Sequence, residues 1–455
     1  SGYDKYNYSL SSTTATKTGA GKITARKITV TATDQSKDYD GDALNANNAC
    51  NVTSGTLVSG HSITCENAGS QTNAGSSTKT LSTVTIKKDT TDVTSNYDIT
   101  KVNGTLTVNK INMTTPTVSI DTNGVVTWNT ITGATSYQIS FDNSTWETAT
   151  SGSKSISTST TGTKTAYVRA VSNTGNYNTP SAVDSESKEV YSLTLNKGTG
   201  IDTVTGAGNY VSGKVVNISA TVLAGYTWEK WTKNSGTSPA STTNASTTVT
   251  IAANTTLTAS ATANIYKITL NNQSAASAGT QEVWYQYKTT KTINNTTCYY
   301  YTNSSLTTCL DSGYIITKPT KTGYTYQGYY TATNGGGTNY VDSNGTFINS
   351  IYQKTPSEIN SSYTDTITLY AKWQGNTYTA TFYYQSNTTS GSMAISTTTA
   401  SCTVDNDDGT CTLTVPTTVR NSVGKYNSAY HGVTTSLSSM EAVETITLDA
   451  NATYY

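Results

Sequence analysis

Six cysteines are the residues whose type and spacing most clearly indicate chemistry. They form three close pairs, namely Cys50 with Cys65, Cys298 with Cys309, and Cys402 with Cys411. Because the pairs lie far apart along the chain, sequential pairing is favoured over every other. Each predicted disulfide would close a turn or a loop and contribute ~2–3 kcal/mol to stability. Disulfides are typical of an oxidising compartment outside the cytoplasm.

Metal binding and a second covalent staple are the alternatives to consider. No cysteine pair has the C-x-x-C spacing of a zinc site, and the only histidines are His61 and His431. The acidic run from Asp405 to Gly409 lacks the distal glutamate of a calcium loop, and Asp-Gly is typical of a hairpin turn. We therefore expect no metal and no cofactor. A lysine–asparagine isopeptide bond beside a buried acid would also stabilise a small core, but the sequence alone selects no such triad.

An enzyme would need a constellation of nucleophile and base, or of paired acids. No Gly-x-Ser-x-Gly motif flanks His61 or His431, and His61 lies in a predicted loop between the first two cysteines. Glu229 is the only acid in an aromatic setting, beside Trp228 and Trp231, where we expect a charge at the rim of a core. We expect no catalytic residue and no enzymatic activity.

Rows of tryptophan and tyrosine could form a platform that stacks on sugar rings. The candidate ligand contacts are Trp284, Tyr285, Tyr299 and Tyr301. Alternate side chains of a strand point to opposite faces, so half of such a row is expected to fill the core. Because residues 299–301 are three consecutive tyrosines, at least one should be exposed, and exposed aromatic residues are enriched at interfaces. The members that are exposed are therefore the candidates for ligand contact, and the alternative is that all four candidates fill the core.

The elements that must position these residues are strands. Thr, Val, Ile and Tyr recur in short alternating patches, and these residues favour a pleated, half-buried surface. The 455 residues are too many for one core, and at about 100 residues per all-β module they predict about four to five modules. The 33 tyrosines, against 3 phenylalanines, suit thin cores whose hydroxyl groups reach water at the rim.

The charge balance excludes several classes of partner. The chain has 28 basic and 28 acidic residues, so we expect no nucleic acid and no anionic membrane as a partner. No apolar run is long enough to span a bilayer, so we expect no membrane segment here. The chain has no initiating Met and no signal peptide, and we expect it to be a piece of a longer protein.

An internal repeat sets the first module boundaries. Asn7 to Leu10, followed by Gly21 to Thr24, recurs as Asn96 to Ile99, followed by Gly104 to Val108. Residues 1–25 are then the end of a preceding copy, and residues 26–110 are a complete module. Its Asp38-Tyr39-Asp40-Gly41 pattern and its ending resemble the MBG family of bacterial surface repeats.

The pattern changes in residues 111–191. Trp128 ends one hydrophobic strand, Tyr137 opens the next, and Ala166 to Val171 alternate as a further strand. This module resembles a fibronectin type III domain. The resemblance implies a sandwich of two sheets with Trp128 in its core.

A second internal repeat divides the remainder into three modules of one ancestry. We name them repeat A (192–264), repeat B (265–374) and repeat C (375–455). Gly225 to Trp231 in repeat A matches Gly323 to Tyr329 in repeat B, and a degraded copy begins at Gly424. The repeats also end alike, with Thr255 to Ala261, Thr366 to Ala371 and Thr445 to Ala450.

Repeat B carries the most specific of these patterns. Lys318-Pro319-Thr320-Lys321 precedes its Gly-Tyr motif, and Leu369 to Trp373 closes it. Repeat B thereby resembles the Listeria-Bacteroides repeat that is also found in internalin-like proteins. Repeats A and C lack the Pro-Thr entry and depart from that pattern.

We therefore expect an all-β fold, a tandem array of small Ig-like β-sandwich and β-grasp-like modules in an elongated chain. The resemblances imply an extracellular protein of the bacterial cell surface, and a structural stalk or adhesin segment that presents binding regions away from the cell. Two alternatives stay open. The repeats could bind glycans or proteins of a host or neighbouring cell through exposed Tyr and Trp, or the chain could self-associate into an extracellular filament through edge strands.

Overall fold

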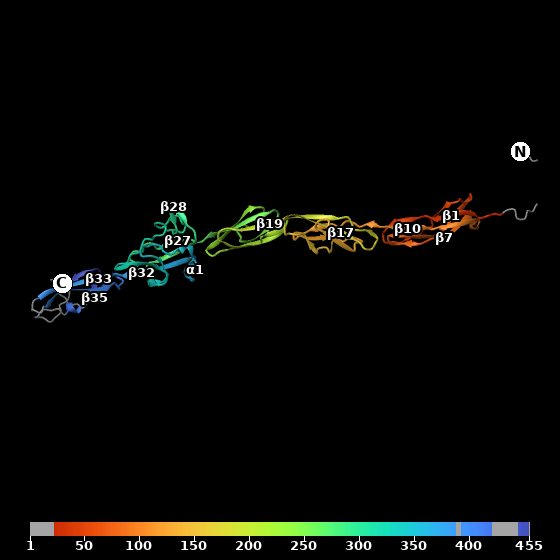
Figure 1. Cartoon of the computed structure of the whole chain (residues 1–455). Helices are drawn as coiled ribbons and strands as arrows, with labels where there is room; N and C mark the ends of the chain where they lie inside the picture. The colour runs from red at the N-terminus through yellow and green to blue at the C-terminus, as the bar shows by residue number, and fades with distance from the viewer. Residues whose placement is uncertain (1–21, 388–392, 421–444, 455) are drawn as a thin grey trace, which may run out of the picture. The chain divides into compact units, whose positions relative to one another are not determined.

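The computed structural model describes residues 22–387, 393–420 and 445–454. Nearly all of their regular structure is strand, which confirms the all-β fold class (Figure 1). The helical segments are short, namely η1 (Thr94–Asn96), η2 (Thr333–Gly335), η3 (Ile351–Gln353), α1 (Pro356–Ile359) and α2 (Thr417–Arg420). The chain divides into two compact units. The first runs to Ser192 and includes Gly208–Lys214 and Ile251–Ala253, and the second comprises the other residues.

Two main sheets form the module of residues 26–110. Its strands are β1 (Arg26–Ala32), β2 (Gln35–Asp38), β3 (Leu44–Asn45), β4 (Cys50–Ser54), β5 (His61–Ala68), β6 (Ser70–Gln71), β7 (Gly75–Lys88), β8 (Thr91–Asp92), β9 (Tyr97–Val102) and β10 (Gly104–Asn109). The strand orders are β4-β1-β9 and β2-β10-β7-β5, with β8 beside β7 and a separate β3-β6 pair. β1 buries every second side chain, Ile28, Val30 and Ala32, as a strand with one solvated face does. These side chains form a core with residues of β7 and β9.

Residues 111–191 form a two-sheet sandwich. Its strands are β11 (Ile111–Asn112), β12 (Val118–Ile120), β13 (Val125–Trp128), β14 (Ser136–Ser140), β15 (Glu147–Ala149), β16 (Lys154–Ser155), β17 (Gly162–Val171), β18 (Tyr177–Asn178) and β19 (Asp184–Lys197). One sheet has the order β12-β13-β16, and β15, β14, β17 and β19 are neighbours in the other. Trp128 is buried and packs with Val126, Ile139 and Val168 from both sheets. Trp128 is therefore the core residue that the sequence predicts.

The repeats continue the series of strands. Repeat A contains β20 (Ile201–Thr205), β21 (Gly208–Val211), β22 (Val215–Val222), β23 (Tyr226–Ser235), β24 (Ser246–Thr250) and β25 (Thr255–Ala263). Repeat B contains β26 (Ile265–Asn271), β27 (Glu282–Gln286), β28 (Lys291–Ile293), β29 (Thr296–Cys298), β30 (Tyr324–Tyr330), β31 (Asn339–Val341) and β32 (Thr366–Gly375). Repeat C contains β33 (Thr377–Asn387), β34 (Met393–Thr403), β35 (Cys411–Thr414), β36 (Thr445–Leu448) and β37 (Ala452–Tyr454).

One framework recurs in the three repeats, because the first strand of each pairs in parallel with its last strand. The pairs are Leu193–Lys197 of β19 with β25, β26 with β32, and β33 with β37. In repeats A and B the strand that carries the Gly-Tyr motif runs antiparallel to the closing strand. Repeat C differs, since the expected closing sequence forms β36 beside β35, and β37 takes the closing position. Its degraded motif at Gly424 lies outside the described residues.

Tyrosine rings fill the core of repeat B, and several of their hydroxyl groups are buried with the rings. Tyr285 Oη donates to the Lys354 carbonyl at 2.9 Å, and Tyr301 Oη donates to the Cys298 carbonyl at 3.0 Å. The buried hydroxyl of Tyr329 has no hydrogen-bond partner within the described protein. The prediction that hydroxyl groups reach water at the rim is therefore wrong for these residues. Burial also raises the pKa of Tyr285 and Tyr329, which keeps both phenols neutral.

All three predicted disulfides are present, with the sequential pairing. Cα–Cα distances are 6.2 Å for Cys50–Cys65, 5.4 Å for Cys298–Cys309 and 6.0 Å for Cys402–Cys411. These distances lie in the range that a disulfide can bridge. The first bond joins β4 to β5, and the third joins β34 to β35 across the turn of residues 404–410. Each bond therefore fixes a local hairpin or loop, as the sequence predicts.

Candidate functional site at the module junctions

The predicted aromatic platform is largely covered. Tyr285 and Tyr301 are 0% exposed, whereas Trp284 and Tyr299 are half-buried and pack against core clusters of repeat B. A sugar cannot stack on a covered ring, so Tyr285 and Tyr301 are not surface ligand contacts. Side chains alternate between buried and half-buried in β27, as expected. Alternation does not extend to residues 299–301, because β29 ends at Cys298, Tyr299 and Tyr300 lie on a bend, and Tyr301 forms isolated β-bridges with Trp284 and Cys309.

Polar residues singled out in the sequence have structural partners. His61 Nδ1 lies 2.8 Å from Tyr97 Oη at the start of β5, so this histidine is part of the fold. Glu229 forms an exposed ion pair with Lys230 at 3.3 Å, as a rim charge would. In the described part of the chain, no group of three His, Cys, Asp or Glu is placed to hold a metal. His431 lies outside the described residues.

The feature that the structure does assemble is a junction between repeats A and B. Its centre is Asn264, the residue between β25 and β26. The Asn264 amide donates to the Gly225 carbonyl at 2.9 Å, and its own carbonyl accepts the Tyr287 amide at 2.9 Å. Its side-chain Oδ1 accepts the Thr227 hydroxyl at 2.6 Å. One linker residue is thus hydrogen-bonded through its amide, its carbonyl and its side chain.

The junction between repeats B and C repeats these bonds atom for atom. Asn376, between β32 and β33, donates its amide to the Gly323 carbonyl at 2.8 Å. Its carbonyl accepts the Val404 amide at 2.8 Å, and its Oδ1 accepts the Thr325 hydroxyl at 2.6 Å. We name this arrangement of a Gly-Tyr-Thr motif around a linker asparagine the linker clamp. Its two occurrences explain why the Gly and the Thr recur in the sequence.

Glycine is required in each clamp because the next repeat approaches its backbone. Gly225 has φ +85° and Gly323 has φ +73°, a region that other residues rarely adopt. A Cβ atom at Gly225 would overlap the Tyr287 ring, and one at Gly323 would overlap the Gly409 backbone. Each glycine therefore serves both the turn and the contact with the following repeat.

The tyrosine of each motif packs into the following repeat. Tyr226 packs against the core of repeat B, with its ring centre 5.6 Å from that of Tyr287. Tyr324 packs against the core of repeat C, and its hydroxyl donates to the Asn406 carbonyl at 3.2 Å. Burial of aromatic area across a junction is a larger stabilising term than one hydrogen bond. The motif therefore joins neighbouring cores as well as backbones.

The remainder of each motif belongs to its own core. Trp228 and Trp231 make a T-shaped pair with ring centres 5.5 Å apart, and Tyr326 and Tyr329 make the same pair at 5.5 Å. The strand register shifts within both pairs, which indicates a β-bulge at the same place in each repeat. One short motif thus specifies an inner aromatic pair and an outer clamp.

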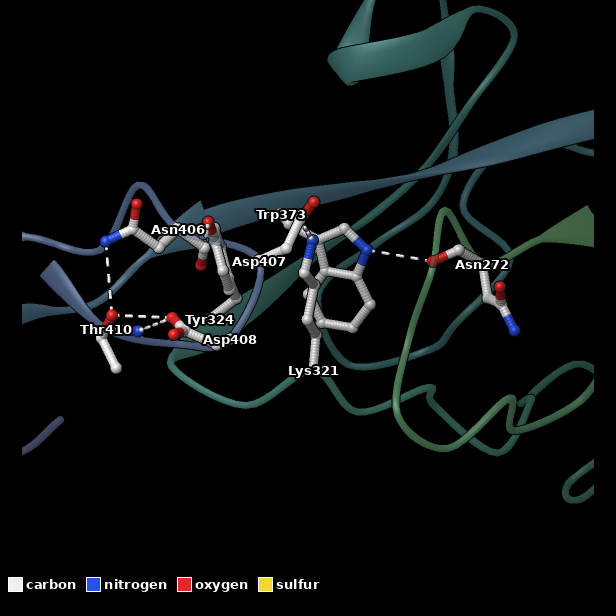
Figure 2. A network of polar contacts seen from close by, with 8 residues as sticks. All are labelled: Asn272, Lys321, Tyr324, Trp373, Asn406, Asp407, Asp408 and Thr410. Carbon is white, nitrogen blue, oxygen red and sulfur yellow. Dashed lines mark hydrogen bonds and ion pairs between the residues drawn. The ribbon is translucent and has the colours of Figure 1, made fainter.

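The B–C junction has an additional polar contact, shown in Figure 2. Lys321 forms an ion pair with Asp407 at 3.0 Å, and its ammonium nitrogen lies 4.5 Å from the centre of the Tyr324 ring (Figure 2). Asp408 shapes the opposing turn, because its Oδ1 accepts the Thr410 amide and hydroxyl at 3.0 and 2.7 Å. The Thr410 hydroxyl and amide lower the pKa of the Asp408 carboxyl. Since Asp407 is exposed, the ion pair orients the contact more than it stabilises it.

A different polar contact joins the modules of residues 26–110 and 111–191. Asn176 Oδ1 accepts the Ala74 amide at 2.9 Å, and Asn176 Nδ2 donates to Asn73 Oδ1 at 3.2 Å. The Tyr39 and Tyr177 rings meet edge to face at 5.8 Å. This junction therefore also uses one asparagine, Asn176, and a pair of tyrosine rings, although its hydrogen bonds differ from those of the linker clamp.

Replacing Thr325 by valine tests the clamp at its side chain. The substitution removes the hydroxyl that donates to Asn376 Oδ1 and leaves the shape of the side chain nearly unchanged. The loss of one such bond is ~1 kcal/mol, so we expect about fivefold faster hydrogen exchange at the amides of Asn376 and Val404. Thr227→Val is the matched control, and it should affect the A–B junction alone. Equal exchange in the parent chain and Thr325→Val would contradict the clamp.

Comparison with known families places one of the repeats. Residues 191–265 match the family model of the divergent InlB B-repeat domain. This match supports a bacterial surface repeat protein. We expected the resemblance to be clearest in repeat B, and the match falls on repeat A, which has the same clamp and the same parallel first and last strands. No curated protein matches the sequence.

The InlB B-repeat match and the three disulfides together indicate an extracellular or cell-surface protein. In the residues that the structure describes, every helix is too short or too polar to cross a bilayer. The resemblances of residues 26–110 to MBG repeats and of residues 111–191 to fibronectin type III domains stay predictions. The linker asparagines share a signal that sequence reasoning missed, because each begins an Asn-x-Tyr tripeptide directly after a closing strand, at Asn264-Ile265-Tyr266 and Asn376-Thr377-Tyr378.

Proposed function

We propose that this chain is a stalk segment of a bacterial surface protein, in which repeated modules are held in fixed relation to their neighbours. The linker clamp is the observation that carries this proposal. It occurs with the same atoms around Asn264 and Asn376, and it uses residues of the repeated motif. A spacer needs such a device, since an unrestrained linker lets adjacent modules reorient.

The physical effect of the clamp is to remove freedom from a single linker residue. Fixing the backbone of one residue is worth ~1–2 kcal/mol of conformational entropy, which the hydrogen bonds and the packed tyrosine must offset. A linker of one residue leaves no additional rotatable segment between β25 and β26 or between β32 and β33. Bending at these junctions therefore requires the clamp to break.

Composition and family support the same role. The family matched by residues 191–265 is a surface repeat. The chain carries equal numbers of basic and acidic residues, so its net charge does not favour a partner of one charge sign, as suits a spacer. Two of the four residues predicted to bind a ligand, Tyr285 and Tyr301, are buried in repeat B, which weakens the alternative of adhesion through exposed aromatic rings. A tip elsewhere in the protein would then make the contact with a cell, and these modules would hold it at a distance.

Pulsed electron paramagnetic resonance on the full chain tests the proposal. Spin labels are attached through non-natural amino acids at the exposed residues Asn360 in repeat B and Thr399 in repeat C. We expect a narrow distribution of label distances in the parent chain and a broad one after Asn376→Gly, which removes the side-chain bond and adds backbone freedom. Asn264→Gly is the control and should leave this distribution narrow. A broad distribution in the parent chain would contradict a stalk with fixed junctions.

A further inference from the structure

Lys79 lies within β7 and is unusual because it is a fully buried lysine. Its side chain is 0% exposed and ranks among the largest buried side chains of the protein. Both groups that its Nζ contacts are uncharged, namely the Thr33 carbonyl oxygen at 2.9 Å and Asn47 Oδ1 at 2.5 Å. Burying an ammonium group against neutral partners is costly, and lysines are almost never fully buried unless they are paired.

The side chain of Asn47 is held in place from several directions. Its Oδ1 also accepts the Ala49 amide at 3.3 Å, so two donors converge on one carboxamide oxygen. Its backbone amide donates to Gln35 Oε1 at 3.0 Å, and its carbonyl accepts Asn67 Nδ2 at 2.8 Å. The disulfide at Cys50 follows closely in the chain. The carboxamide is therefore presented to Lys79 by a fixed backbone.

Asp34 supplies an acid beside this pair. It lies next to Thr33 at the corner between β1 and β2, and its Oδ1 accepts the Thr105 amide at 2.7 Å. Gly104 is the residue paired with Lys79 in the neighbouring strand, and a side chain there would overlap the Ala32 carbonyl and crowd the Asp34 carboxylate. Burial lowers the pKa of the Lys79 ammonium, and the charge of Asp34 opposes that shift.

We propose that Lys79 and Asn47 form an intramolecular isopeptide bond. The neutral Nζ attacks Asn47 Cγ, the Cγ–Nδ2 bond breaks, and Nδ2 leaves as ammonia with the proton that Nζ gives up. Nothing is oxidised or reduced, and no co-reactant is consumed. The Ala49 amide donates to Oδ1, where negative charge develops in the tetrahedral intermediate. Asp34 accepts the proton that the Lys79 ammonium must lose before the attack and passes it to the released ammonia, which enters the solvent as ammonium.

Proximity is the main driving factor for this slow chemistry. Amines and carboxamides do not condense in water at a useful rate, but intramolecular groups held in contact gain effective concentrations of about 10⁵ M and above. Asn47 and Asp34 are both exposed, so the ammonia released from Asn47 Nδ2 can leave to solvent. Loss of ammonia to solvent also makes the step irreversible in practice.

The isopeptide bond would give the module a covalent cross-link that, unlike the disulfides, reductants do not open. It would join the segment before β4 to the first half of β7, and the two linked residues are 32 positions apart in the sequence. The Cys50–Cys65 disulfide joins β4 to β5, and a reductant can open it. An amide bond persists under reducing conditions, so the module would keep one covalent cross-link in either environment.

Intact mass spectrometry of the full chain, secreted with its disulfides formed, tests this proposal. We expect the mass to be lower than that of the disulfide-bonded sequence by one ammonia molecule. A protease digest should contain one branched peptide that carries both Asn47 and Lys79. Lys79→Arg and Asn47→Ala should each restore the ammonia and abolish the branched peptide. A parent chain of unmodified mass, with linear peptides at both positions, would overturn the proposal.

Two controls make the result specific. Asparagines before glycine also lose ammonia on forming a succinimide, so the digest must locate the change away from Asn103, Asn123, Asn334 and Asn344. Asp34→Asn should leave a mixture of linked and unlinked chains. Complete linkage in that variant would show that Asp34 takes no part in forming the bond. Formation of all three disulfides verifies that each variant has folded. If a variant does not fold, the peptide map of the parent chain still tests the proposal by itself.

Discussion

Replacing Trp231 by alanine is expected to lower the stability of repeat A by ~3–5 kcal/mol, as loss of a buried tryptophan does. The side chain is 1% exposed, and its indole nitrogen donates to the Ala245 carbonyl at 3.2 Å. The substitution would leave a large cavity and remove one of the two hydrogen bonds to the Ala245 carbonyl, which also accepts the Ala220 amide at 3.2 Å. Hydrogen exchange of the β22 and β25 amides, read against those of residues 26–110, measures the loss and locates it in one repeat.

Trp228→Ala is the matched control for this prediction. Trp228 belongs to the same motif and touches Trp231, but it is only half-buried, and its indole nitrogen donates to the Thr243 carbonyl at 2.8 Å near the surface. We expect less than half of the loss found for Trp231→Ala. Equal losses would mean that the two rings form one unit, and that the outer ring is as much core as the inner one.

Removing the Cys402–Cys411 disulfide, by replacing both cysteines with serine, is expected to loosen repeat C and its junction with repeat B. The bond closes a loop with a sequence separation of 9, for which the chain-entropy model gives ~2.5 kcal/mol. The turn inside that loop supplies Asn406, Asp407 and Gly409 to the junction. Faster hydrogen exchange at Val404 and Asn376 would report the opening.

A second double substitution and one cysteine-free module serve as controls. Replacing Cys50 and Cys65 with serine should loosen β4 and β5 and leave the Asn376 amide unchanged, because that disulfide lies in the other compact unit. Residues 111–191 contain no cysteine and should keep their thermal transition when a thiol reductant is added. A global collapse of all modules on reduction would show that the disulfides act together rather than locally.

The sequence predicts those parts of the structure that depend on local pattern. Alternation identifies β1 and the buried Trp128, and the close spacing of the cysteines identifies all three disulfides. The sequence also locates the repeated Gly-Tyr motif, although not its role. Strand alternation and disulfide pairing could be predicted for the same reason, since strand periodicity and short loop closures are properties of neighbouring residues.

Features that depend on contacts between distant residues could not be predicted in this way. Tyr301 was expected in a strand with one solvent-exposed face. The chain instead bends after Cys298, and the Tyr301 ring is buried. Asn376 begins an Asn-x-Tyr tripeptide, as Asn264 does, but its bonds to Gly323 and Val404 follow only from the fold. Lys79 meets Asn47 because β7 passes the loop before β4, which no local pattern indicates. In repeat C the closing strand is displaced to β37, so similarity of sequence did not give the strand order there.

The construction of the linker clamp has a consequence for how such genes change length. Each clamp draws its glycine, tyrosine, threonine and asparagine from one repeat and its linker, and from the next repeat it takes a backbone amide and a surface for the tyrosine ring. Tyr287 and Val404 supply that amide although their side chains differ. Unequal recombination that duplicates or deletes one whole repeat would therefore create a new boundary with its bonds already in place. A gain or loss of one repeat would then need no compensating mutation at the new boundary.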